Sequence, residues 1–74
     1  MAVVGRAKRR ILEALERKPT HGYELAKRTG LPLTGIYEHL RQLAGEGFVS
    51  GEAQGRRIVY RLTEKGRLLL RSIR

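Results

Sequence analysis

Four polar side chains recur at helical spacing between residues 34 and 42, and their types suit hydrogen bonding to the edges of DNA bases. Arginine pairs with guanine through two hydrogen bonds, glutamine pairs with adenine, and threonine can contact a thymine methyl group. The residues outside the apolar stripe of this segment are the candidate base-contacting residues: Thr34, Gly35, Tyr37, Glu38, Arg41 and Gln42. Glu38 would repel phosphate, but it could accept a hydrogen bond from cytosine or hold Arg41 in place. The competing interpretation is an ordinary solvated helix face.

A second candidate lies in the turn between two strand-like segments. Its residues are Gln54, Gly55, Arg56 and Arg57. Glycine permits a tight turn and a close approach of the backbone to a phosphate, and two adjacent arginines at an exposed tip suit phosphate contact or insertion into a minor groove. The alternative is that the charged tip only prevents edge-to-edge aggregation of strands.

The overall charge favours an anionic partner. Sixteen Lys and Arg residues stand against seven acidic residues, which gives a net charge of +9 in 74 residues. Such a surplus attracts polyanions, and double-stranded DNA is the leading candidate. Further phosphate contacts are predicted at these residues: Arg6, Lys8, Arg9, Arg10, Lys27, Arg28 and His39. The first four begin a predicted helix, where positive charge opposes the helix dipole, so either phosphate or solvation of a frayed end compensates.

Several classes of function are disfavoured by the residue types that are missing. The chain has no Cys and no Asp, and it has two His. Disulfides and thiol nucleophiles are therefore excluded, zinc ligands are scarce, and no paired acid and base points to an enzyme. We expect no catalytic residue, no cofactor and no metal. The absence of Asn and Cys is typical of a thermophilic source.

Membrane association and secretion are also disfavoured. No apolar run approaches the roughly 20 residues that a membrane span needs, and no segment has a long apolar face opposite a basic one. The residues Met1 to Gly5 lack the apolar core of a signal peptide. We therefore expect a cytoplasmic, nucleoid-associated protein.

The apolar pattern predicts a single domain over residues 1–74 that is mainly α with a small β-hairpin. The expected elements are helices over residues 6–18, 22–28 and 32–47, strands over residues 48–53 and 58–62, and a last helix over residues 64–74. Leu33, Ile36, Leu40 and Leu43 form one core-facing stripe on the third helix. Two short helices joined by a glycine-containing turn form a helix-turn-helix, whose second helix usually lies in the major groove. The order helix, helix, helix, strand, strand, helix therefore predicts a winged helix-turn-helix.

The aromatic residues and His21 favour structural interpretations. Tyr23, Tyr37 and Tyr60 are each flanked by apolar residues, so we expect core packing, although Tyr37 could instead present its hydroxyl to a phosphate. His21 stands just before a predicted helix, where a structural role is expected. His39 lies at the edge of the third helix, where it could contact a phosphate.

The chain resembles the PadR-type branch of winged-helix transcriptional regulators over about residues 11 to 70. The matching stretches are Ile11-Leu12 through Pro19, His-Gly-Tyr-Glu-Leu at residues 21–25, Gly-Ile-Tyr at residues 35–37, Leu40, Leu43, Glu-Gly-Phe-Val at residues 46–49, Arg57 and Tyr-Arg-Leu-Thr-Glu-Lys-Gly-Arg at residues 60–67. The resemblance implies three helices, a two- or three-stranded wing and a further helix. It also implies a DNA-binding repressor that works as a dimer, with the third helix as the recognition helix.

The resemblance departs from the family pattern at the C-terminal end. Family members usually continue into a helical segment that forms the dimer and often an effector pocket, whereas this chain stops at Arg74. We therefore expect a short form with no small-molecule effector site. Three consecutive leucines spread around more of the last helix than one core face needs, which predicts a homodimer interface at Leu68, Leu70 and Ile73, together with the first helix.

Three functions compete at this point. The first is a sequence-specific double-stranded DNA-binding transcriptional regulator, with Thr34, Glu38, Arg41 and Gln42 specifying the sequence. The second is an architectural chromatin protein that coats DNA without discriminating between sequences. The third is a winged-helix module that binds another protein inside a larger complex. The specificity ratio for DNA separates the first from the other two.

Overall fold

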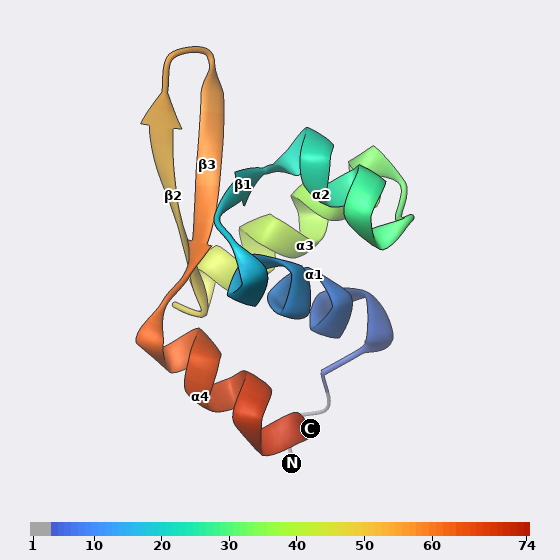
Figure 1. Ribbon diagram of the computed structural model, residues 1–74, viewed down its shortest axis with the longest axis vertical. Coiled ribbons are helices and arrows are strands. Elements are labelled where there is room, and N and C mark those ends of the chain that lie inside the picture. Colours follow the sequence, from blue (N-terminus) through green and yellow to red (C-terminus); the bar gives the residue numbers. More distant parts are fainter. Residues whose placement is uncertain (1–3) are drawn as a thin grey trace.

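The structure is a computed structural model that describes residues 4–74, so residues 1–3 of the domain predicted over residues 1–74 lie outside the described residues. Its elements are α1 (Arg6–Arg17), β1 (Thr20–His21), α2 (Gly22–Thr29), α3 (Leu33–Gly45), β2 (Val49–Gln54), β3 (Arg57–Leu62) and α4 (Glu64–Ile73). The β2–β3 hairpin projects beside the three packed helices α1 to α3, and α4 lies on the other side of α1 from α2 (Figure 1). This arrangement confirms the predicted winged helix-turn-helix fold.

The sheet has three antiparallel strands in the order β1-β3-β2. The hairpin register runs from Val49 opposite Leu62 to Gln54 opposite Arg57, and only Gly55 and Arg56 form the turn. Gly55 adopts a positive φ of 63°, as such two-residue turns require. Gln54 and Arg57 are therefore the last strand pair and not part of the turn, which corrects the sequence-based boundary. The strand β1, which the apolar pattern did not predict, adds two further pairs to β3.

The core lies where α1, α2, α3, α4 and the base of the hairpin meet. Its fully buried large side chains are Ile11, Leu12, Leu25, Ile36, Leu40, Leu43 and Leu70. Three of the four residues in the predicted stripe of α3 are therefore buried. The fourth, Leu33, is 38% exposed, so its predicted place in the core was wrong. Leu33 is the first residue of α3 and lies one turn before Ile36, outside the part of the helix that the core covers.

Hydrogen bonds and backbone turns at the helix ends hold the segments that connect the helices. Thr63 caps α4, because its Oγ1 accepts a hydrogen bond from the Gly66 backbone N–H at 3.0 Å. The same hydroxyl donates to the Gly47 carbonyl oxygen at 2.6 Å, which ties the start of α4 to the end of α3. The helix α2 ends at Gly30, whose φ of 74° permits a left-handed cap, and Pro32 then precedes α3.

Substitutions at two helical glycines should have opposite effects on stability. A Cβ at Gly66 would overlap the carbonyl oxygen of Phe48, whereas a Cβ at Gly45 would meet nothing within 4 Å. We expect Gly66→Ala to lower the free energy of unfolding by about 2 kcal/mol or more, as overpacking does. Gly45→Ala should raise it by about 0.5 kcal/mol through the unfolded state. Urea denaturation measures both, and equal effects would contradict the close packing of α4 on Phe48.

Candidate nucleic-acid interface

The outer face of α3 carries the side chains that the sequence predicted to lie there. Thr34, Tyr37, Glu38 and Arg41 are exposed, and Gly35 and Gln42 are half-buried. The division follows from helical spacing, since Ile36, Leu40 and Leu43 occupy the opposite face and are buried. The structure thus brings the predicted base-contacting residues together on one exposed helix face.

Glu38 accepts hydrogen bonds from two other side chains of this face, Arg41 and Gln42. The Arg41 guanidinium donates to Glu38 Oε1 at 2.6 Å from Nη2 and to Oε2 at 3.4 Å from Nε. Gln42 Nε2 donates to the same Oε1 at 3.1 Å. The hydrogen bond from Arg41, with a further one from Gln42, lowers the pKa of the Glu38 carboxyl, and the carboxylate raises the pKa of Arg41. Glu38 therefore stays ionised and fixes the direction in which Arg41 and Gln42 point.

A groove of about 430 Å³ separates the hairpin from the helices α2 and α3. Its lining residues are His21, Gly22, Tyr23, Tyr37, Arg56, Arg57 and Ile58. Tyr37 is 49% exposed, and its ring lies so close to Gly22 that an added Cβ would be 2.7 Å from its Cε1 atom. Tyr23 is exposed too, so the core packing expected for Tyr23 was wrong, and the exposure of Tyr37 agrees with the second of its two interpretations. Tyr60 does pack against the core, as expected. Aromatic residues flanked by apolar ones can line a groove as well as a core.

The wing residues that the sequence predicted all lie at or near the tip of the hairpin. Gln54, Gly55, Arg56 and Arg57 are exposed. Arg56 and Arg57 line the groove from one side and Tyr37 lines it from the other. The groove therefore joins the wing and α3 into one continuous surface.

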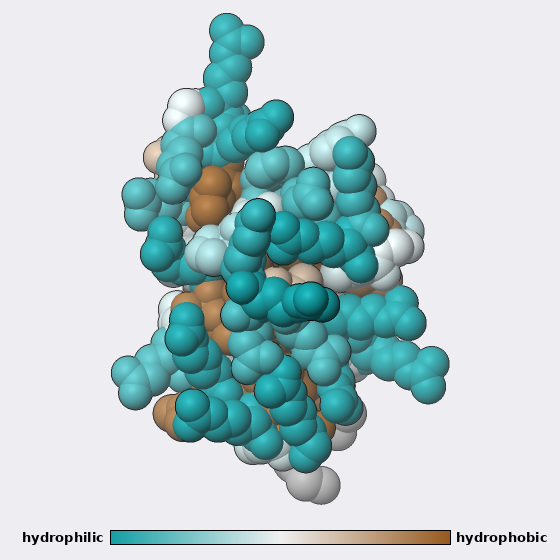
Figure 2. All heavy atoms as spheres, viewed as in Figure 1, coloured by the Kyte–Doolittle hydropathy of each residue, from teal (hydrophilic) through white to brown (hydrophobic). Residues whose placement is uncertain are grey.

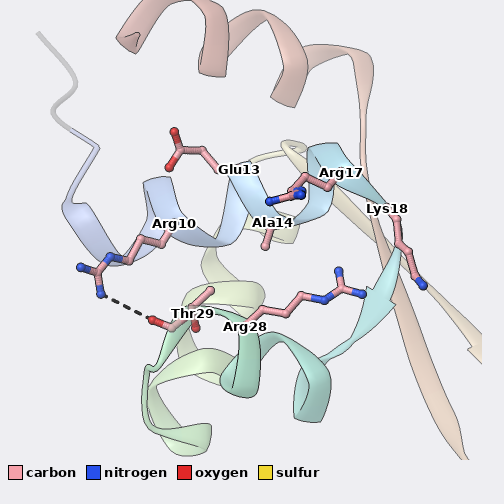
Figure 3. A pocket seen from close by; sticks show the side chains of 7 residues that line it. All are labelled: Arg10, Glu13, Ala14, Arg17, Lys18, Arg28 and Thr29. Atoms are coloured by element: carbon pink, nitrogen blue, oxygen red, sulfur yellow. Dashed lines mark hydrogen bonds between the residues drawn. The ribbon is translucent and has the colours of Figure 1, made fainter.

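A second and larger groove, of about 870 Å³, lies between α1 and α2 (Figure 3). Its cationic lining residues are Arg10, Arg17, Lys18 and Arg28. Arg10 Nη1 donates to the Thr29 carbonyl oxygen at 3.5 Å, at the end of the groove opposite Lys18. Sequence reasoning named Arg10 and Arg28 but missed Arg17 and Lys18. Arg17 follows Arg10 by seven residues, about two helical turns, and so shares its face.

The remaining predicted phosphate contacts do not form a single site. Arg6 is exposed, Lys8 is half-buried, and Arg9 pairs with Glu13 at 3.7 Å. Lys27 Nζ lies 5.5 Å from the centroid of the Tyr23 ring. His39 is half-buried, and its Nδ1 atom is buried with no hydrogen-bond partner among the described residues. Nδ1 of His39 therefore cannot reach a phosphate.

The residues of the predicted dimer interface lie in different environments. Leu68 is 56% exposed on α4, whereas Leu70 is fully buried in the core of this chain. Ile73 is half-buried and packs against the same core. Leu70 is therefore a core residue and not available to a partner, because it lies two residues from Leu68 and faces the opposite side of the helix. The face drawn in Figure 2 is largely hydrophilic, with hydrophobic surface beside the wing and on α4. The wing carries the exposed Ile58, and α4 carries the exposed Leu68.

None of the helices within residues 4–74 has the length and the apolar character that a membrane span requires. No group of three or more His, Cys, Asp or Glu side chains in that range is placed to hold a metal ion.

The family model described as the transcriptional regulator PadR-like family matches residues 11–72 of the chain. No curated protein matches the chain in sequence. The family match therefore rests on almost the whole of the described domain and includes α3, the hairpin and α4.

Solved structures show the same fold. The transcriptional regulator BldR from Sulfolobus solfataricus is similar with a TM-score of 0.88 and 24% identity, over 93% of this chain and 52% of that one. Adhesin competence repressor (AdcR) from Streptococcus pyogenes is similar with a TM-score of 0.86 and 17% identity, over 93% and 54%. The chain thus spans about half the length of these structures.

A third similar structure is shorter. It is the homodimeric winged helix-turn-helix DNA-binding domain of Mb0332 from Mycobacterium bovis, a possible ArsR-family regulator. Its TM-score is 0.80 and its identity is 27%, over 93% of this chain and 66% of that one.

Removing Glu38 should strengthen binding to DNA of any sequence. Glu38→Ala deletes one negative charge from the outer face of α3 and releases Arg41 and Gln42, so the affinity for arbitrary duplex DNA should rise about two- to fivefold, the scale of an exposed charge interaction. Fluorescence anisotropy with a random-sequence duplex measures the change. Glu16→Ala is the matched control, because it removes the same charge from α1. An equal gain in both variants would show that only total charge matters.

Proposed function

The chain belongs to the transcriptional regulator PadR-like family, and on that premise we propose that it binds double-stranded DNA at specific sequences and represses transcription. Members of that family are transcription regulators and not enzymes. We propose that residues 1–74 act as one DNA-binding domain of a nucleoid-associated, cytoplasmic protein. In this proposal α3 enters the major groove, and the wing contacts the backbone or the minor groove.

One observation carries the proposal. Tyr37 of α3 lines the same groove of about 430 Å³ as Arg56 and Arg57 at the tip of the hairpin. A duplex seated on α3 would therefore bring its neighbouring backbone to the wing. An ordinary solvated helix face gives no reason for such a juxtaposition.

Sequence discrimination in this proposal comes from few side chains. Thr34, Arg41 and Gln42 would contact base edges, and Glu38 would hold the latter two in a defined direction before DNA arrives. A side chain that is held in place loses less conformational freedom on binding. Phosphate contacts from the wing, from Arg10 and Arg28 and from the N-terminal arginines would position the protein without specifying sequence.

A coating role is the second candidate, and the groove between α1 and α2 is the observation that favours it. Arg17, Lys18 and Arg28 place positive charge away from α3, so phosphate contacts could form on more than one side of the molecule. A protein that only neutralises phosphate shows no preference between sequences and a steep dependence on salt. The two functions therefore differ in the specificity ratio.

Selection of binding sites from a random duplex library tests the proposal. We expect a two-fold symmetric site bound at least about 10³-fold more tightly than a scrambled duplex. Arg41→Ala should lose about 1–3 kcal/mol of discrimination at one base pair per half-site. Arg71→Ala, which removes an exposed arginine from α4, is the matched control and should keep the preference. Emergence of no motif, with the same salt dependence on both duplexes, would favour the coating role.

The half-site symmetry also requires a dimer, which we propose forms around the exposed Leu68 of α4. Leu68→Glu should give a folded monomer in sedimentation, because a charge placed at an apolar interface disfavours association. Leu70→Glu should instead unfold the chain, since it buries a charge in the core and costs more than about 3 kcal/mol. Urea denaturation separates the two outcomes. A Leu68→Glu variant that remains dimeric would place the interface elsewhere.

A further inference from the structure

The imidazole ring of His21 faces two hydrogen-bond donors. Its Nδ1 atom lies 3.3 Å from the backbone nitrogen of Glu24, at the start of α2. Its Nε2 atom lies 3.2 Å from Nη1 of Arg57, at the base of the wing turn. A neutral imidazole has one N–H donor and one acceptor. The ring can therefore satisfy only one of its two neighbours.

The acceptor belongs to Glu24. Its backbone N–H is one of the first of α2 and has no partner within the helix, so the residue before the helix must cap it. The Arg57 side chain is long and exposed, and it can turn elsewhere. This assignment leaves Nδ1 without a proton and puts the proton on Nε2. In that tautomer, the Nε2–H group and the Arg57 guanidinium face each other as two donors with no acceptor between them.

The fold holds these two donors together. The pairing of β1 with β3 sets His21 opposite Val59, and Arg57 lies two residues from Val59 on the same face of β3. The strand β1 has two residues, and its second is the cap of α2. His21 therefore links the helix-turn-helix to the wing through backbone pairing, which fixes its place beside Arg57.

We infer that His21 and Arg57 together bind one phosphate oxygen of the DNA backbone, with His21 Nε2–H and the Arg57 guanidinium as its two donors. This inference rests on the proposed function and assigns a role to a residue that the base contacts leave unused. A phosphate oxygen can accept from both donors, so it resolves their conflict, and the positive end of the α2 dipole favours an anion there. Both residues line the groove of about 430 Å³, and Tyr37 lines it as well. A phosphate group of the DNA backbone could enter this groove.

The position of the His21 ring proton can be tested without DNA. Long-range ¹H–¹⁵N correlation spectra of the free protein in mildly alkaline solution distinguish a protonated Nε2 from a protonated Nδ1. We expect the proton on Nε2. A proton on Nδ1 would overturn the inference, because Nε2 would then accept from Arg57 in the ordinary way and no donor would be left for a phosphate.

A double-mutant cycle tests whether His21 and Arg57 share one phosphate, using the duplex selected from the random library. His21→Asn keeps an N-cap acceptor for Glu24 but removes the ring Nε2–H that faces Arg57, and when the shorter Asn side chain caps Glu24 through its oxygen, its amide nitrogen does not take the place of Nε2. It should leave the Tm of the free protein unchanged or slightly raised and weaken DNA binding about tenfold, the scale of one hydrogen bond to a charged group. Arg57→Gln should weaken binding and reduce the salt slope by about 1. The double variant should lose less than the product of the two single losses, because both donors serve one oxygen.

The other possible results show whether the shared phosphate or the proposed function is wrong. Binding of His21→Asn as tight as wild type, or losses that multiply independently, would overturn the shared phosphate while leaving the proposed function intact. Inorganic phosphate that shifts the His21 ring signals while His21→Asn still binds the duplex normally would assign the site to free phosphate and overturn the DNA assignment. A wild-type protein that binds no duplex would overturn the proposed function itself. Glu64→Gln on α4 is a control that changes a helix N-terminus away from the groove.

Discussion

The burial of Ile36, Leu40 and Leu43 is the constraint on which the rest of the interface depends. These three side chains fix the rotation of α3 about its own axis, since turning the helix would expose apolar surface worth about 25 cal/mol per Å². With that rotation fixed, Glu38 and Arg41 must point away from the core. Core packing therefore determines which side chains of α3 face the solvent, and no interaction between those exposed side chains is needed to set the rotation of the helix.

The wing is held in place by contacts at its base and along β3. Thr63 binds the Gly47 carbonyl, Gly66 packs on the Phe48 backbone, and β1 pairs with β3. The hairpin is thus anchored at its base on one side by α4 and on the other by the segment before α2. A lone two-stranded hairpin is marginal in water, so these anchors explain why a ribbon with mostly exposed residues can hold a defined position beside the helices.

Periodicity in the sequence predicted the helices, the hairpin and the outer face of α3, because each depends on a repeat that one segment carries by itself. It missed β1, since two residues show no alternation, and it placed Leu33 in the core because spacing cannot show where coverage of a helix ends. It also treated Leu68 and Leu70 alike, although two positions apart on a helix lie on different faces. Both grooves escaped prediction because each forms between separate elements, and the apolar pattern of one segment does not show how it packs against another.

The charge distribution sets a limit on how specificity can arise in so small a domain. A net charge of +9 attracts every duplex equally, and cationic side chains line grooves on two sides of the molecule. Under the proposed function, discrimination would come from side chains whose direction is fixed before DNA binds, because such side chains lose less conformational freedom on binding. Glu38 lowers the positive charge of the outer face of α3 but holds Arg41 and Gln42 in one arrangement. Under the proposed function, this carboxylate would therefore lower the general affinity for DNA while orienting the side chains that discriminate between sequences.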